Sequence, residues 1–340
     1  MSELPGPLFP PCAGSGLRLG LGGAPLGNLF APVEPAQARA TVDAAWDGGC
    51  RSFDTAPHYG HGLSERRVGD ALQPRPRASF VLSSKVGRLM TANSAAAPDQ
   101  HGYVGVLPFD QHWDYSAGGV RRSLEDSLQR LGLSRIDVAY VHDCDGATHG
   151  PQAGAVLRQV IDETLPALQG LKAEGLVRAI GLGVNDLAIV HAVLREAPLD
   201  ALLLAGRYSL LDHSALPALL PLIRERRVHL ALGGVFNSGL LATGTRSGAG
   251  QPRFNYAAAA QAWVERTQRI EALCDAHGVP LRAAALQFAL AHPAVEVVML
   301  GARSAREWHD AQAMARVAIG PDFWRALRGA GLLPDAAPTP

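Results

Sequence analysis

The sequence predicts an α/β fold in which eight parallel strands alternate with helices and close into a (β/α)8 TIM barrel. Three observations support this prediction. Apolar runs of strand length alternate with segments of helical spacing along the chain. Runs such as residues 201–204, Ala-Leu-Leu-Leu, have no polar face, which is typical of strands buried on both sides. Ionisable residues follow three successive runs, and the carboxyl ends of barrel strands form one face where catalytic groups gather.

The expected elements follow one another in a regular order. Apolar residues at Ala38, Val42 and Ala45 indicate the first helix, and Ser64 is placed to cap the second. Strands are expected at residues 17–22, 52–56, 80–86, 137–141, 177–184, 201–204, 228–232 and 295–300. Helices are expected at residues 35–48, 64–72, 118–131, 156–174, 187–195, 216–226 and 257–277, with a long loop at 87–116 after the third strand. We expect one domain over residues 1–340, with a barrel core at about 17–316 and a C-terminal tail at 317–340.

A doubly wound open sheet is the structural alternative to the barrel. Such a fold should carry a glycine-rich turn between the first strand and the first helix. Residues 20–25 read Gly-Leu-Gly-Gly-Ala-Pro and do not fit the G-x-G-x-x-G pattern, and Pro25 stands where the helix should begin. The barrel is therefore the preferred architecture.

Composition favours a small solute as the partner. The chain has 31 basic and 31 acidic residues, so no global field attracts nucleic acid or an anionic membrane. The four cysteines lie far apart and the histidines form no ligand pattern, so we expect neither a metal site nor a disulfide framework. No uncharged apolar run reaches the roughly 20 residues that span a bilayer, and residues 1–11 do not read as a secretory signal. We therefore expect a cytoplasmic protein.

Four residues near the ends of three successive strands form the candidate catalytic group. Asp54 lies near the end of the run 52–56, Lys85 ends the run 79–85 and His142 ends the run 136–142, while Tyr59 follows the first run closely. A phenol beside an ammonium can transfer protons, and a carboxylate can keep the ammonium charged and oriented. Taken singly, Asp54 would be a turn residue and Lys85 a solvated strand end, but their joint placement favours catalysis.

Several motifs resemble the aldo-keto reductases over residues 17–316. The matching blocks are 53–60 (Phe-Asp-Thr-Ala-Pro-His-Tyr-Gly), 63–69 (Leu-Ser-Glu-Arg-Arg-Val-Gly), 84–87 (Ser-Lys-Val-Gly) and 141–142 (Val-His). Within that family, the blocks 113–116, 206–211 and 233–239 are similar to the bacterial aldose 1-dehydrogenases, also called D-threo-aldose or L-fucose dehydrogenases. The pyridoxal 4-dehydrogenases look similar and are the next closest group. The resemblance implies a barrel that binds a nicotinamide dinucleotide at the carboxyl ends of its strands.

The resemblance also implies the catalytic roles. Tyr59 would exchange a proton with the substrate oxygen, and since a free phenol has a pKa of about 10, a nearby cation is needed to stabilise its phenolate. Lys85 would supply that cation and Asp54 would pair with Lys85. His142 would hydrogen-bond the substrate oxygen and orient the reacting carbon.

The implied dinucleotide contacts come from three segments. Asn185 would hold the nicotinamide carboxamide, and Glu307 stands where NADP-using relatives place an arginine against the 2′-phosphate. Two further departures are Ala205 in place of a glutamine that binds the carboxamide and Gly233 in place of a tyrosine that stacks on nicotinamide. The backbone contacts are expected from Gly234, Phe236, Asn237, Ser238, Gly239 and Leu240 along the pyrophosphate, and from Gly301, Ala302, Arg303 and Ser304 at the adenosine phosphate. These features predict that NAD is preferred and NADP is possible.

Substrate contacts are expected from four residues, each with a structural alternative. Trp113 would stack on a sugar ring or anchor a lid, and Arg207 would meet sugar hydroxyls or pair with Asp212. His58 and Asp143 would contact substrate or only shape their loops. We therefore expect oxidation of an aldose such as L-fucose or D-arabinose at C1 to the lactone. The alternatives are pyridoxal oxidation, general aldehyde reduction and, without catalysis, a nicotinamide-sensing subunit; the direction of reaction and the oligomeric state are left open.

Overall fold

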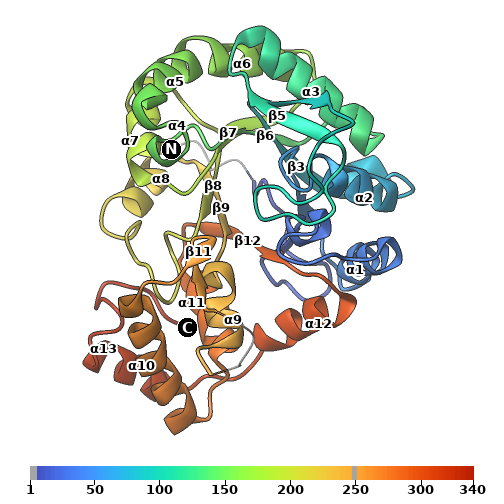
Figure 1. Cartoon of the computed structure of the whole chain (residues 1–340). Coiled ribbons are helices and arrows are strands. Elements are labelled where there is room, and N and C mark those ends of the chain that lie inside the picture. The colour runs from blue at the N-terminus through green and yellow to red at the C-terminus, as the bar shows by residue number, and fades with distance from the viewer. Residues whose placement is uncertain (1–5, 247–250) are drawn as a thin grey trace.

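A closed barrel of eight parallel strands forms the centre of the molecule (Figure 1). The computed structural model describes residues 6–246 and 251–340, so the prediction at residues 1–11 lies partly outside the described residues. The barrel order is β1, β12, β9, β8, β7, β6, β3 and β2, which closes on β1. These strands are β1 (Leu19–Gly22), β2 (Ser52–Asp54), β3 (Val81–Val86), β6 (Val138–His142), β7 (Ala179–Val184), β8 (Ala201–Ala205), β9 (His229–Gly233) and β12 (Val295–Gly301). The (β/α)8 prediction is confirmed.

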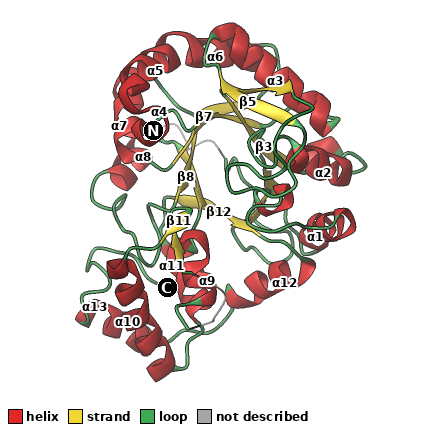
Figure 2. Ribbon diagram, in the orientation of Figure 1, coloured by secondary structure: helices red, strands yellow, loops and turns green. Residues whose placement is uncertain are grey.

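Helices surround the strands and bury their outer faces (Figure 2). The main ones are α1 (Pro35–Asp47), α2 (Leu63–Leu72), α3 (Ala117–Leu131), α6 (Leu165–Ala173), α7 (Leu187–Glu196), α8 (Leu219–Arg226), α10 (Gln261–His277), α11 (Leu281–Ala291), α12 (Ala305–Met314) and α13 (Pro321–Gly329). A second apolar cluster fills the barrel interior, with Phe9 packed against strand residues such as Val138 and Val297. The side chains inside and outside the strands are therefore both buried, as the unbroken apolar runs require.

The expected loop 87–116 contains a two-stranded hairpin. Strand β4 (Arg88–Ala92) pairs antiparallel with β5 (Phe109–Trp113), and the register sets Arg88 opposite Trp113. Gly87 joins β3 to this hairpin at a φ of 102°, and a Cβ there would lie 2.4 Å from Cε1 of Tyr115. Only glycine fits this turn, so the sharp exit from β3 is what carries Arg88 back over the strand ends.

Several other segments differ from the sequence expectation. Helix α12 was not predicted, and α2 begins at Leu63, so Ser64 lies inside the helix and does not cap it. The predicted helix 156–174 is divided into α5 (Ala153–Gln159), a π-turn at Val160–Thr164 and α6. The predicted helix 257–277 begins at Gln261, because residues 253–258 form the small hairpin of β10 (Arg253–Phe254) and β11 (Ala257–Ala258). Helix α11 was missed because it is buried on nearly every side and lacks a polar stripe. The tail 317–340 includes α13, which lies beside α10 in Figure 1 and buries Phe323, Trp324 and Leu327.

Candidate active site

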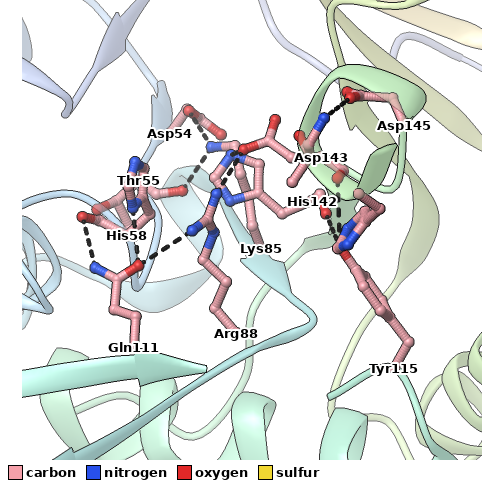
Figure 3. Close-up of polar contacts among 12 residues, drawn as sticks. Asp54, Thr55, His58, Lys85, Arg88, Gln111, Tyr115, His142, Asp143 and Asp145 are labelled. Atoms are coloured by element: carbon pink, nitrogen blue, oxygen red, sulfur yellow. Dashed lines mark hydrogen bonds and ion pairs between the residues drawn. The ribbon is translucent and has the colours of Figure 1, made fainter. Parts of the chain in front are cut away.

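The buried pair of Asp54 and Lys85 forms the base of the site. Lys85 Nζ donates to Asp54 Oδ2 at 2.8 Å and to the Thr55 carbonyl at 2.8 Å (Figure 3). Ser83 Oγ donates to Asp54 Oδ1 at 2.7 Å. The lysine side chain is 1% exposed and the aspartate side chain 5%. Because β2 and β3 are neighbours with Asp54 opposite Ser83, the barrel register brings these groups together as expected from their strand ends.

Tyr59 lies over this ion pair. Lys85 Nζ is 4.7 Å from the centre of the tyrosine ring, and the imidazole of His142 lies edge-on with its centre 6.2 Å away. Burial raises the pKa of the Tyr59 phenol well above its ordinary value, and the Asp54 carboxylate acts in the same direction. This direction is opposite to the expected lowering by Lys85. The physical reason is that the Lys85 ammonium is bound by the Asp54 carboxylate and the Thr55 carbonyl, so the phenol lies beside an ion pair whose net charge is zero.

His142 is the last residue of β6, and a hydrogen bond to its backbone carbonyl fixes its position. The Tyr115 hydroxyl donates to the His142 carbonyl at 2.7 Å, and Nε2 of the imidazole lies 3.4 Å from Asp143 Oδ2. Burial lowers the pKa of His142 well below its ordinary value, with further contributions from Arg88 and Lys85. Nδ1 is buried and has no hydrogen-bond partner among the described residues. The imidazole is therefore neutral and able to hydrogen-bond a substrate oxygen.

Arg88, which was not among the predicted site residues, connects three of the four predicted substrate residues. Its Nη2 donates to Asp143 Oδ2 at 2.9 Å and its Nη1 to Gln111 Oε1 at 3.3 Å (Figure 3). Its Cζ lies 3.6 Å from the centre of the Trp113 ring. Nδ1 of His58 lies 2.9 Å from the same oxygen of Gln111. Burial, followed by the charge of Arg88, lowers the pKa of His58 to about 3. The sequence signal that could have indicated Arg88 is its position directly after Gly87, at the end of the third strand.

Arg207 is placed differently from the other three. Its Nη1 lies 3.3 Å from Asp212 Oδ2, and its Nε donates to the carbonyl of Asn185. The structure therefore brings together His58, Trp113 and Asp143 but uses Arg207 to hold the segment after β7. These contacts favour pairing of Arg207 with Asp212 over contact with sugar hydroxyls.

A cavity of about 640 Å³ joins two of the four catalytic residues to the predicted dinucleotide segments. Asp54 and Tyr59 line it, as do residues that follow β7, β9 and β12. The predicted cofactor residues on its wall are Asn185, Gly234, Phe236, Asn237, Ser238, Gly239, Gly301, Ala302, Arg303 and Glu307. Leu240 is buried at the start of α9 (Leu240–Thr243), and Ser304 instead caps α12 by accepting a hydrogen bond from the Glu307 amide at 3.2 Å. Two of the predicted contacts are thus absent from the cavity wall.

Glu307 has a structural role besides lining the cavity. Its Oε2 accepts a hydrogen bond from the amide of Arg303, the residue before the N-cap, at 2.8 Å, and its own amide donates to Ser304 Oγ at 3.2 Å. The carboxylate is therefore fixed at the helix start, where a positive helix end would otherwise attract an anion.

The sequence profile described as the Aldo/keto reductase family matches residues 18–330 of this chain. The chain belongs to the aldo/keto reductase family. The pyridoxal 4-dehydrogenase of Microbacterium luteolum is 43% identical, over 93% of this chain and 94% of that protein. The D-threo-aldose 1-dehydrogenase of a Pseudomonas species is 41% identical, over 96% of this chain and 98% of that protein. Among solved structures, the aldo-keto reductase AKR11C1 from Bacillus halodurans, in its holo form, has a TM-score of 0.70 and 25% identity, covering 94% of this chain and 95% of that one.

Aldo/keto reductases use NAD(P)H, and the cavity fits such a group. Asn237 lines the cavity, yet both polar atoms of its amide are buried without a partner among the described residues. Asn237, Ser238 and Gly239 have φ values of 44°, 58° and 100°, a run of left-handed backbone that costs free energy. Unpaired buried amide atoms and a strained turn are typical of a loop shaped for a polar ligand. Among the described residues, no cluster of three or more His, Cys, Asp or Glu could hold a metal ion, and no helix is long and apolar enough to cross a membrane.

Proposed function

We propose that this aldo/keto reductase oxidises the C1 hydroxyl of a cyclic aldose to the lactone. The observation that carries the proposal is the wall beside His142, where the Trp113 indole stands against the charged pair of Arg88 and Asp143. The Arg88 guanidinium covers one face of the indole, so the wall combines an aromatic ring, a guanidinium and a carboxylate. A sugar ring presents C–H groups on its faces and hydroxyls at its edge, so it suits a wall of this composition. The 41% identity to a D-threo-aldose 1-dehydrogenase supports the same substrate class.

Proton transfer is assigned to Tyr59, His142 and the buried pair. The dinucleotide, when bound, supplies the hydride acceptor for oxidation. Asn185, the turn 236–239 and residues 301–303 would hold it along the cavity. The neutral His142 donates a hydrogen bond to the substrate oxygen, and Tyr59 takes the hydroxyl proton in oxidation or gives it back in reduction. Since the raised pKa keeps Tyr59 protonated at neutral pH, oxidation should speed up as the pH rises while reduction stays flat.

NAD is proposed as the preferred dinucleotide, with NADP as a slower alternative. The Glu307 carboxylate lines the cavity and is fixed by the Arg303 amide, so it would repel a 2′-phosphate. Arg303 and Arg306 also line the cavity, and either guanidinium could meet that phosphate. The expected result is therefore a preference for NAD and not an exclusion of NADP.

Pyridoxal 4-dehydrogenase activity is the second candidate, because the 43% identical relative carries that name. A flat pyridine ring could also stack on Trp113. The test is to follow NADH and NADPH absorbance with L-fucose, D-arabinose, other aldoses, pyridoxal and simple aldehydes at equal cofactor concentrations. Turnover of pyridoxal without turnover of any aldose would refute the aldose proposal, and failure of all substrates would favour a nicotinamide-binding role.

A further inference from the structure

Arg88 is fixed on three sides at the end of the barrel that carries the catalytic residues. Its side chain is 12% exposed and makes separate contacts to Asp143, Gln111 and the face of Trp113. Asp143 itself has a φ of 43°, which is unfavourable for a residue with a side chain. A strained residue that holds its carboxylate against a half-buried guanidinium indicates that the position of this carboxylate matters.

The groups that face His142 come from four segments. Lys85 lies on β3, His58 and Tyr59 lie between β2 and α2, and Arg88 begins β4. Asp143, the residue after β6, is the carboxylate nearest to the imidazole, at 3.4 Å. After burial, the charge of Arg88 is the largest cause that lowers the pKa of His142, ahead of Lys85. The same charge opposes the rise in the pKa of Asp143 that its burial causes.

We propose that Arg88 is a positioning residue of this site, whose guanidinium holds the Asp143 carboxylate and the Trp113 indole beside His142 as one substrate-orienting wall. The inference rests on the proposed function and names the device that orients its substrate. Two properties of the guanidinium are separable. The planar fork bonds Asp143 and Gln111 while its face covers the indole, which a lysine cannot do at once. The charge alone disfavours protonation of His142, and a lysine retains it.

Two variants at this position separate the two properties. Arg88→Lys keeps the charge and loses the fork, so the KM for the sugar or pyridoxal should rise about tenfold while the KM for NAD stays as in the wild type. The acid limb of the pH profile of kcat/KM, which protonation of His142 sets, should also stay as in the wild type. Arg88→Met loses both, so the same KM should rise further and the acid limb should move to higher pH by about one unit. The direction follows because loss of the cation leaves His142 and Asp143 free to share a proton.

Arg77→Met is the matched control. Arg77 also pairs with a buried carboxylate, with Nη2 at 2.5 Å from Asp137 Oδ2, and its Cζ lies 4.7 Å from the centre of the Phe80 ring. It stands at the amino end of the barrel, because Asp137 directly precedes β6. This variant should lower the melting temperature without changing the ratio of the two KM values or the acid limb.

The His142 titration followed by NMR in the free protein makes the inference independent of the substrate. The signal is assigned with a His142→Asn variant. A higher His142 pKa in Arg88→Met than in wild type and Arg88→Lys would support the charge role even if no aldose or pyridoxal is turned over. The inference is overturned if Arg88→Met behaves as Arg77→Met does, with lower stability, both KM values changed equally and an unmoved His142 titration.

Discussion

Lys85→Met tests the buried ion pair that anchors the tetrad. The two charges lie 2.8 Å apart, so their attraction is roughly 6 kcal/mol at an effective dielectric constant of about 20. Desolvation offsets much of this value, but removal of the lysine alone leaves the Asp54 carboxylate buried and unpaired. The expected loss is about 3–5 kcal/mol in the free energy of unfolding, a large share of the roughly 5–15 kcal/mol typical of a folded protein.

The double variant Lys85→Met/Asp54→Asn should recover about 2 kcal/mol of that loss. The introduced carboxamide has no charge to bury and its oxygen can still accept from Ser83, whereas the Thr55 carbonyl stays without the lysine donor, at a cost of about 1–3 kcal/mol. Both variants should lack turnover. Urea unfolding without cofactor gives the stabilities, and kcat gives the activities.

Lys172→Met is the control for this experiment. Lys172 pairs with Asp200 at 2.6 Å, but the two side chains are 34% and 32% exposed, so its loss should cost less than about 1 kcal/mol. If Lys85→Met costs no more than this control, or if the double variant is as unstable as the single one, the reasoning from an uncompensated buried charge is wrong.

The remaining predictions concern proton transfer, substrate and cofactor. Tyr59→Phe should lower kcat by about 10² to 10⁴ with NAD binding nearly unchanged, and near-normal turnover would remove Tyr59 from the mechanism. In the wild type, the oxidation rate should rise with pH throughout the neutral range because the phenol pKa is raised. Trp113→Ala should raise the KM for aldoses roughly tenfold and Trp113→Phe much less, whereas equal changes in the KM for NAD would indicate a folding defect. Glu307→Arg should improve kcat/KM with NADP by roughly ten- to a hundredfold while lowering stability by about 1 kcal/mol through loss of the α12 cap. Glu307→Gln, which can keep that cap, is the control. A wild-type preference for NADP would contradict the placement of Glu307 beside the 2′-phosphate.

The sequence alone determined the barrel and the proximity of Asp54, Lys85 and His142 at one end of it. The reason is that strands buried on both faces have unbroken apolar runs, and parallel strands all end on one side. A residue at the carboxyl end of each run is then close to the others whatever the loops do. The neighbouring positions of β2, β3 and β6 in the barrel satisfy this condition.

Only the tertiary structure decided how these groups are charged and which residues surround them. Arg88 and Asp143 are 55 positions apart, and their contact depends on the turn at Gly87 and the pairing of β4 with β5, neither of which has a strong local signal. The pKa of Tyr59 depends on burial and on how Lys85 divides its hydrogen bonds, and both arise only when the chain is packed. The role of Arg207 likewise depends on the packed chain, in which Asp212 and the Asn185 carbonyl lie beside it, because a guanidinium bonds whichever acceptors the fold brings within reach.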